Sequence, residues 1–412
     1  MATKAIAPWQ RSKLAEVAEV RTGIAKNNEK ALTDPVELPY LRVANVQDGH
    51  LDLTEIKTIA VESSRVERYS LEDGDVLMTE GGDFDKLGRG AVWRNQISPC
   101  LHQNHVFAVR VNRKHLLPEF LAAYCAAEPG RRYFLACSKQ TTNLASINSS
   151  QLKALPLRLP SLDEQRRIVR VLDAADRQID LAEKIAKETA DQSAAIASKL
   201  IASIAGKQVD LAQVVSRVRR PPTNADVVPL TISAESGLVP QSTFFGRRVA
   251  SDVIDSYTLI RRGEFAYNKS YSNGYPYGAI KRLEDVEEGV LSSLYLCFGA
   301  DDQDALDGNY LAAVCESGFF NRQIHMIAHE GARNHGLLNV SAEDFFSMRL
   351  PLPNQQEQKR IADAVRAARA RVQPSRERVE SLQRQKRALM QKLLTGQQRL
   401  TRDLPGMEPG DV

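Results

Sequence analysis

Residue types that could catalyse a reaction occur in this sequence, but not in the spacing that catalysis needs. An amino-methyltransferase needs an Asn/Asp-Pro-Pro-Tyr/Phe motif, and the nearest segment, Arg220-Pro221-Pro222-Thr223, lacks both the amide or acid and the aromatic ring. An ATP-driven motor needs a GxxxxGK[ST] phosphate loop, which the sequence does not contain. Gly88-Arg89-Gly90 is an isolated glycine-rich fragment and is more typical of a turn. We therefore expect a chain without catalytic residues of its own.

Metal and cofactor chemistry find no better support. The histidines form no HExxH motif, and His102 and His105 have a strand spacing that does not by itself bring two rings to one metal ion. The cysteines form no CxxC pair and are odd in number, which is typical of a reduced, cytoplasmic protein. These cysteines are Cys100, Cys125, Cys137, Cys297 and Cys315. We expect neither a metal site nor a bound cofactor in this chain.

Side chains suited to DNA recognition, in contrast, collect in four polar loops. DNA bases are read by Arg, Lys, Asn, Gln and Ser donors that reach the base edges. Two such loops, residues 79–90 and 138–143, lie in the first half of the chain, and residues 268–277 and 329–335 lie at matching places in the second. The candidate contacts are Lys86, Arg89, Lys139, Gln140, Thr141, Asn143, Lys269, Tyr271, Ser272, Asn273, Tyr277, Arg333 and Asn334. Ordinary surface-turn chemistry explains any single one of them as well, so the hypothesis depends on the whole set.

The composition permits a polyanionic partner without demanding one. The chain has 412 residues, 43% hydrophobic and 26% charged, with a formal net charge of +4. This length is enough for two or three domains with cores of their own. No apolar run is long enough to span a bilayer, and residues 1–10 lack the apolar stretch of a signal peptide. A cytoplasmic, globular protein is therefore expected.

The elements that must position these loops occur twice. Four segments recur in the same order about 190 residues later in the chain, which indicates an internal duplication. The paired segments are 13–17 with 210–214, 72–77 with 261–266, 120–125 with 310–315, and 159–168 with 352–361. Cys125 and Cys315 fall in the same apolar pattern of the two copies, which predicts core packing for both.

Each copy begins with a mixed domain and ends with a helix. Short alternating runs such as residues 106–111, separated by glycine-rich turns, predict a small α/β domain. Pro160 and Pro353 each precede a polar first turn, which is a helix-start signal. We expect an α/β (α+β) fold with two similar domains, two long antiparallel coiled-coil helices and a pseudo-two-fold internal repeat. The expected boundaries are 1–160 and 206–353 for the domains, 161–205 and 354–400 for the helices, and 401–412 for a flexible tail.

The two helical segments carry the same apolar register. A 4-3 spacing places one residue series of each helix on a single seam, which must be buried against another helix. The series are Ile168, Leu172, Ala175, Ile179, Ala182, Ala186, Thr189, Ser193, Ile196, Leu200 and Ile361, Val365, Ala368, Val372, Ser375, Val379, Leu382, Lys386, Leu389, Leu393. Antiparallel packing predicts that Ile168 lies near Leu393 and Leu200 near Ile361. Two unrelated surface helices, each packed on its own domain, are the alternative.

Two further features distinguish the second helix. Pro374 removes a backbone hydrogen bond and should kink or break the helix. Residues 163–204 hold seven Lys/Arg against eight Asp/Glu, whereas residues 355–393 hold eleven against four. The basic helix could follow DNA phosphates or an acidic partner surface, or it could simply be a solvated face.

The combined pattern resembles the specificity subunits of type I restriction-modification enzymes, and the resemblance covers essentially the whole chain. Its marks are residues 9–20, the Leu-Pro then Glu-Gln-Arg-Arg-Ile helix entry at 159–168, the repeat of that entry at 352–361, and residues 385–396. Each mark alone is weak, but they occur in order and in duplicate. Pro374 departs from the straight second helix that the family pattern suggests.

The resemblance implies a role for each part. Each domain would be a target-recognition domain that reads one half of a split DNA sequence, and the helices would hold the halves apart. The implied partners are double-stranded DNA, two methyltransferase subunits and restriction/translocase subunits, with no membrane. S-adenosylmethionine, ATP and Mg would be bound by those partner subunits. A structural adaptor that bridges proteins through its helical pair, without binding DNA, is the alternative function.

Overall fold

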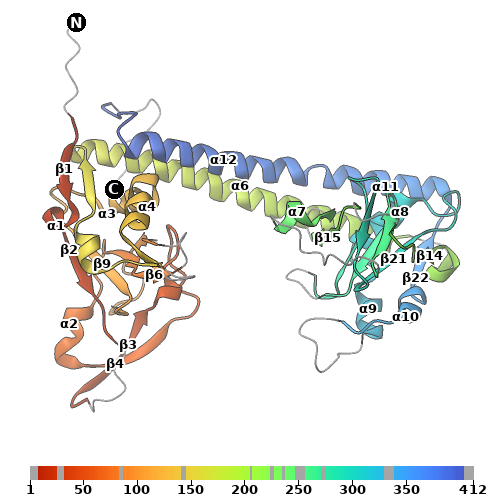
Figure 1. The fold of residues 1–412 in the computed structure, drawn as a ribbon, viewed down its shortest axis with the longest axis horizontal. Helices are drawn as coiled ribbons and strands as arrows, with labels where there is room; N and C mark the ends of the chain where they lie inside the picture. The colour runs from red at the N-terminus through yellow and green to blue at the C-terminus, as the bar shows by residue number, and fades with distance from the viewer. Residues whose placement is uncertain are drawn as a thin grey trace, which may run out of the picture. The chain divides into compact units, whose positions relative to one another are not determined.

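The computed structural model describes residues 8–25, 32–82, 87–88, 90–140, 145–204, 207–222, 227–233, 237–245, 256–270, 275–328 and 338–402, and it describes no side chains at 82, 139, 140, 244 and 245. The chain divides into two units (Figure 1). Unit 1 consists of Met1–Leu181 and Val379–Val412, and unit 2 of Ala182–Arg378. Unit 1 is therefore built from both ends of the chain, whereas unit 2 is one continuous stretch.

Unit 1 is built around an antiparallel four-stranded sheet with the strand order β2-β9-β5-β7. A second sheet has the order β4-β3-β8, a third β10-β11-β6, and β1 pairs with β12. The strands are β1 (Gln10–Lys13), β2 (Ala18–Thr22), β3 (Pro35–Leu41), β4 (Lys57–Glu62), β5 (Val76–Thr79), β6 (Gly81–Gly82), β7 (Gly90–Val92), β8 (Leu101–His102), β9 (Val106–Val111), β10 (Lys139–Gln140), β11 (Ala145–Ser146) and β12 (Pro156–Leu159). The helices are α1 (Leu14–Val17), α2 (Val66–Tyr69), α3 (Pro118–Ala126), α4 (Glu128–Cys137), α5 (Ser149–Lys153) and the first half of α6 (Leu162–Ala202).

Unit 2 repeats the main sheet of unit 1. Its four-stranded sheet has the order β14-β21-β18-β19, and β13 pairs with β22 as β1 pairs with β12. The strands are β13 (Lys207–Asp210), β14 (Val215–Arg217), β15 (Leu230–Ser233), β16 (Gly237–Pro240), β17 (Thr258–Arg261), β18 (Phe265–Asn268), β19 (Ala279–Arg282), β20 (Glu288–Leu291), β21 (Tyr295–Ala300) and β22 (Arg349–Leu352). The helices are α7 (Gln241–Phe245), α8 (Gly308–Glu316), α9 (Asn321–Ile327), α10 (Ala342–Phe346), α11 (Gln355–Arg369) and the start of α12 (Val372–Leu394). The duplication predicted from the sequence is thus a duplication of strand order.

The repeated turn before the central strand has a structural reason. Gly74 and Gly263 both have positive φ, at 89° and 92°, a conformation that favours glycine. Asp75, which follows Gly74, is buried and accepts two hydrogen bonds from Arg110 at 2.9 and 2.8 Å. Glu264, which follows Gly263, instead accepts a hydrogen bond from Arg220, which follows β14 in the chain. An acid at this place is therefore kept in both units, although its cation is supplied differently.

The helix entry found twice in the sequence is held by a buried glutamine. Gln165 accepts a hydrogen bond from the Leu117 amide at 2.9 Å and donates to the carbonyls of His115 and Pro160 at 2.9 and 3.1 Å. The side chain is fully buried, so each of its polar atoms needs a partner within the protein. These bonds fix the first turn of α6 against the segment that leads into α3.

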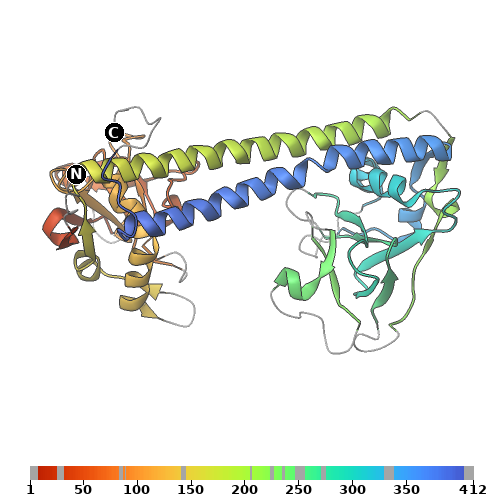
Figure 2. The same ribbon diagram turned by 90° about the horizontal axis from the view of Figure 1, so that it is seen from above.

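Within each unit, a part of α6 packs against a part of the C-terminal helices (Figure 2). In unit 1, Ile168 and Leu393 share one hydrophobic core, and Asp176 forms an ion pair with Lys386. In unit 2, Leu200 packs against the core that contains Ile361. The two residues of each predicted pair thus belong to one hydrophobic core, and in unit 1 the pairs Ile168–Leu393 and Asp176–Lys386 follow an antiparallel order.

The seam prediction was wrong at Ile196. Its side chain is 44% exposed, whereas Ala197 and Ile201 are buried in the core of unit 2. The buried stripe moves by one residue after Ser193 because 3.6 residues per turn drift away from a strict seven-residue repeat.

The predicted effect of Pro374 is confirmed. The helical segment is interrupted at Ala370 and Arg371, between the end of α11 and the start of α12. Pro374 cannot donate to the carbonyl of Ala370, and its ring would collide with that carbonyl in a continuous helix.

No helix within the described residues is long and apolar enough to cross a membrane. The prediction of core packing holds for Cys125, which is buried, and for Cys315, which packs against the core of unit 2. Burial raises the pKa of the Cys125 thiol to about 12, so it stays protonated and unreactive.

Candidate nucleic-acid interface

Unit 1 brings the bases of its two predicted DNA-binding loops together. β6 leads into the loop at residues 83–89, and β10 and β11 flank the loop at residues 141–144. β11 pairs with β10 on one side and with β6 on the other, with Ser146 opposite Gly81. The Ile147 amide also donates to the Glu80 carbonyl at 2.8 Å. The bases of two loops that are far apart in the sequence therefore lie side by side. We call these paired residues, 80–82 and 145–147, the loop edge of unit 1.

A glycine beside this edge tolerates no side chain. Gly88 has a φ of 68°, and a Cβ atom there would lie 2.3 Å from the ring of Phe134 in α4. Phe134 is fully buried, so the ring cannot move away without opening the core. Leu87 and Gly88 thus form a tight turn against α4, and Arg89 lies outside the described residues.

Unit 2 repeats this arrangement with different residues. Lys269 follows the central strand β18 as Glu80 follows β5, and the Leu338 amide donates to the Lys269 carbonyl at 2.9 Å. The bases of the loops at 271–274 and 329–337 are therefore also joined. We call Lys269 and Leu338, which this hydrogen bond joins, the loop edge of unit 2.

Only part of the predicted contact set lies within the described structure. Lys139 and Gln140 form β10, and only their backbone is described. Lys86, Arg89, Thr141, Asn143, Tyr271, Ser272, Asn273, Arg333 and Asn334 lie outside the described residues. The assignment of these side chains to DNA stays a prediction.

Lys269 is held by its own unit. Its Nζ donates to the Val340 carbonyl at 2.6 Å, and burial together with the nearby Arg217 lowers its pKa. One of the three ammonium donors is thus used to join the two loop bases. Lys269 can therefore position the edge even where it does not contact a base.

Tyr277 also has a structural contact. Its ring packs edge-on against His325 of α9 at a centroid distance of 5.6 Å, and its carbonyl accepts a hydrogen bond from the Tyr267 hydroxyl at 3.0 Å. Tyr277 itself packs against the core of unit 2.

Three residues at the loop edges were missed in the sequence. In unit 1, His105 lies beside Glu80, with 2.5 Å between Nδ1 and Oε2, and the Glu80 amide donates to the His105 carbonyl at 2.9 Å. Leu294 precedes β21 in unit 2 as His105 precedes β9 in unit 1, and its side chain is 59% exposed. Aligning the two repeats position by position would have marked these residues, because they flank the same strand pair.

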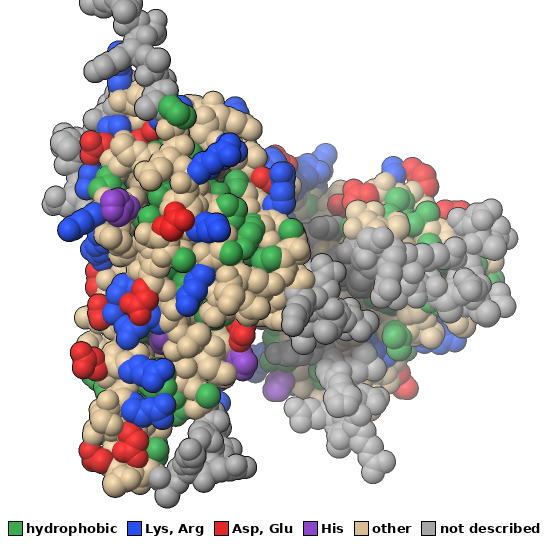
Figure 3. All heavy atoms as spheres, turned by 60° about the vertical axis from the view of Figure 1, so that its left-hand side comes forward, with side chains coloured by type: hydrophobic (Ala, Val, Ile, Leu, Met, Phe, Trp, Pro, Cys, Tyr) green, Lys and Arg blue, Asp and Glu red, His purple; other side chains and the backbone are tan. Residues whose placement is uncertain are grey.

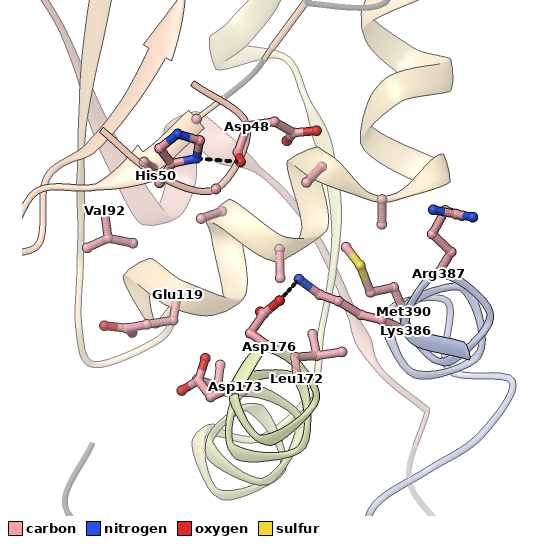
Figure 4. Close-up of a pocket in the computed structure, with 18 of the residues that line it drawn as sticks. Asp48, His50, Val92, Glu119, Leu172, Asp173, Asp176, Lys386, Arg387 and Met390 are labelled. Atoms are coloured by element: carbon pink, nitrogen blue, oxygen red, sulfur yellow. Dashed lines mark hydrogen bonds and ion pairs between the residues drawn. The ribbon is translucent and has the colours of Figure 1, made fainter. Parts of the chain in front are cut away.

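The surface of unit 1 also carries a groove of about 1300 Å³ (Figure 4). Small and apolar side chains such as Val92, Ala126, Leu172 and Met390 line it together with charged ones. Four of the five Lys and Arg side chains that line it form ion pairs with lining carboxylates, namely Arg94 with Glu119, Arg131 with Asp48, Arg132 with Glu128, and Lys386 with Asp176. Phosphate binding needs cations that are not already neutralised, so this groove is a poor DNA site.

Unit 2 is filled at the corresponding position. Glu316 of α8 forms ion pairs with Lys281 of β19, at 3.2 Å, and with Arg369 at the end of α11. By the offsets of the repeat, these residues stand where Val92, Ala126 and Asp176 line the groove of unit 1. At these three described positions, unit 2 therefore does not repeat the lining of the groove.

Acidic and basic side chains are mixed on the face of unit 1 shown in Figure 3. This face shows no large region of one sign, which agrees with the small net charge of the chain. In the described part of the chain, no group of three or more His, Cys, Asp or Glu residues could hold a metal ion.

Comparisons with known proteins give one consistent result. Residues 7–189 match a family model described as the type I restriction modification DNA specificity domain. The chain is 21% identical over 416 residues to the putative type I restriction enzyme MjaX specificity subunit of Methanocaldococcus jannaschii, which covers 95% of this chain and 94% of that protein. It is 28% identical over 171 residues to the type I restriction enzyme EcoKI specificity subunit of Escherichia coli K12, which covers 41% of this chain and 36% of that protein.

A solved structure supports the fold. A chain from work on complex assembly and conformational transition of the type I R-M system has a TM-score of 0.62 at 17% identity, covering 95% of this chain and 99% of that chain. The expected fold class, with its two similar domains and long helices, is confirmed by this likeness.

Proposed function

Because the chain belongs to the specificity subunits of type I restriction-modification systems, we propose that it recognises a two-part DNA sequence on behalf of partner enzymes. Each unit reads one half of the sequence through its loop edge. The chain is the DNA-reading component of the complex and determines which sequence the complex acts on.

The observation that carries this proposal is the repeated loop edge. In each unit, two loops rich in hydrogen-bond donors start from one hydrogen-bonded base next to the central sheet. The frame is the same, but the residues on it differ, as with Glu80 in one unit and Lys269 in the other. Two similar frames with different side chains fit a target whose two halves differ in sequence.

In this proposal, the long helices bind the partner subunits and set the distance between the two half-sequences. α6 continues for 41 residues without interruption, which corresponds to about 60 Å at 1.5 Å per residue. Two methyltransferase subunits dock on the helical segments, and restriction/translocase subunits join the complex through them. The basic C-terminal helix gives that surface a charge unlike that of α6.

The chemistry is assigned to those partners and not to this chain. S-adenosylmethionine is bound and used by the methyltransferase subunits, and ATP and Mg by the restriction/translocase subunits. The purified chain should therefore neither methylate nor cut DNA, and turnover of S-adenosylmethionine by the chain alone would refute this assignment.

The test is selection of DNA from a random duplex library. The chain is purified with its methyltransferase partner, the bound DNA is sequenced, and the partner alone serves as the control. We expect two short enriched sequences separated by a gap of constant length, seen only when this chain is present. A stable complex that enriches no sequence would instead support the structural adaptor.

A further inference from the structure

The loop edge of unit 1 carries a carboxylate that phosphate binding does not explain. Glu80 is the residue directly before β6, at the base of the first predicted DNA-binding loop, and its side chain is 31% exposed. A carboxylate repels the phosphates of an approaching duplex, and such like-charge contacts are costly at an interface. Base edges, however, include amino groups that donate hydrogen bonds, and these favour an acceptor.

His105 holds this carboxylate in one orientation. Its Nδ1 lies 2.5 Å from Oε2 of Glu80, and its Nε2 lies 3.4 Å from the side-chain amide of Asn104. A neutral imidazole with its proton on Nδ1 satisfies both contacts, since it donates to Glu80 and accepts from Asn104. Among the residues that the structure describes, His105 is the only side chain that bonds to Glu80, and it does so through Oε2 and not through Oε1.

Comparison with unit 2 argues against a purely structural role. The two units keep the buried glutamine, the glycine turns and the joined loop bases. Glu80 and His105, in contrast, are replaced by Lys269 and Leu294 at the corresponding positions. A pair needed only to build the edge would be expected in both copies. Side chains that differ between the two units, on a backbone frame that both units share, are the ones expected to contact the ligand.

We propose that Glu80 reads a cytosine in the half-sequence of unit 1 by accepting a hydrogen bond from the N4 amino group, with His105 as its positioning residue. The cytosine N4 amino group points into the major groove, where Glu and Asp are its usual acceptors. This inference depends on the proposed function, since it assigns one base within a half-sequence that unit 1 would read.

The experiment compares Glu80→Gln with the parent chain, each in complex with the methyltransferase partner, by selection from a random duplex library. A glutamine amide pairs well with adenine, because it can accept from N6 and donate to N7. We expect one C·G position of one half-sequence to lose its preference for cytosine over adenine by about tenfold, roughly the value of one good base contact. All other positions and the second half-sequence should stay unchanged.

Two further sets of variants separate base reading from structural effects. Glu67→Gln removes an exposed carboxylate of α2 in the same unit and should leave every position unchanged. His105→Ala should weaken discrimination at the same C·G position, and His105→Gln, whose amide can still donate to Glu80, should retain more of it. Thermal unfolding of each variant checks the fold, and Glu80→Asp replaces Glu80→Gln if the latter is unstable.

Each result decides between the two proposals. A parent complex that selects a sequence, together with a Glu80→Gln complex that selects the same one, overturns this inference and leaves the proposed function intact. An equal change of affinity for all sequences also overturns it, because it assigns Glu80 to the general charge of the edge. A parent complex without any sequence preference overturns both.

Discussion

Gln165 in unit 1 and Gln358 in unit 2 make the same three hydrogen bonds, each within its own unit. Gln358 accepts from the Asp307 amide at 2.8 Å and donates to the carbonyls of Ala305 and Pro353 at 3.0 and 2.9 Å. All six bonds of the two glutamines go to backbone atoms. The frame therefore does not depend on which side chains surround it, and the two units can differ elsewhere.

Replacing either glutamine should destabilise its unit. Gln165→Ala leaves the Leu117 amide and two carbonyls without partners in a buried place, and this costs about 2–3 kcal/mol in free energy of unfolding. Gln358→Ala should cost a similar amount. Calorimetric unfolding measures both, with Gln192→Ala, at an exposed position of α6, as the control. Equal stability of Gln165→Ala and the control would contradict the assigned role.

The stability of unit 1 should depend on the ionisation of Glu164. Burial raises the pKa of this carboxyl, but hydrogen bonds from Arg399, Trp9 and the Leu400 amide outweigh burial, and the net shift is downward. The ionised pair thus stabilises the fold fully above the unfolded pKa near 4.3, and this contribution is lost as the pH falls through the lower pKa of the folded state.

Arg399→Ala tests this ion pair. It leaves a carboxylate that is only 3% exposed without its cation, and we expect a loss of about 3 kcal/mol at neutral pH. The acid-induced loss of stability should become smaller at the same time, because Glu164 then no longer has a lowered pKa. Unfolding midpoints measured from about pH 7 down to about pH 3 show both effects. Arg402→Ala, at an exposed site in the same tail, is the control, and a parallel decline of the two variants would argue against the pair.

Substitutions in the loops should act on one half-sequence at a time. Lys139→Ala and Arg89→Ala should weaken recognition of the half read by unit 1, and Arg333→Ala that of the other half, by about 1–3 kcal/mol for a bidentate base contact. Lys269→Ala should also act on the half read by unit 2, but through the position of its loop edge, because the Lys269 ammonium donates to the Val340 carbonyl. Binding is measured with duplexes altered in one half or the other. A uniform loss for all sequences would reassign these residues to phosphates, and four variants without any effect would place the interface elsewhere.

The length of α6 should determine the gap between the half-sequences. Four residues inserted near Ala194, slightly more than one turn, add about 6 Å along the helix, or one to two base pairs at about 3.4 Å each. Local unwinding can absorb part of this insertion, because four residues are not a full heptad. Methylome sequencing of the variant beside the parent measures the gap. Changed half-sequences with an unchanged gap would rule out a spacing role for α6.

The large features of the fold could be predicted because they follow from repetition and periodicity. Offsets between repeats need only a comparison of the chain with itself, and Pro374 acts on its own helix. Ile196 was misplaced because a strict heptad ignores the drift of a real helix. The role of Gln165 could not be seen, since its partners near residue 115 lie about 50 residues away and are backbone atoms.

The recognition residues were harder to predict for a physical reason. Any polar loop residue can contact a base, so residue type alone does not separate readers from surface turns. The pair of Glu80 and His105 is 25 residues apart in the sequence and becomes visible only when the strands place it. Lys269 shows the opposite case, a plausible reader in the sequence whose ammonium is bound to Val340.

The construction of unit 1 from both ends of the chain has a consequence for its biosynthesis. Unit 2 is encoded by one uninterrupted stretch, so all of its residues are available once the ribosome has passed Arg378. Unit 1 needs the second half of α12 for its core and Arg399 for its buried carboxylate, and both are translated after Arg378, the last residue of unit 2. The unit that emerges first is therefore the last to be completed, and until then its nascent chain exposes the apolar face of α6 that Leu393 will cover.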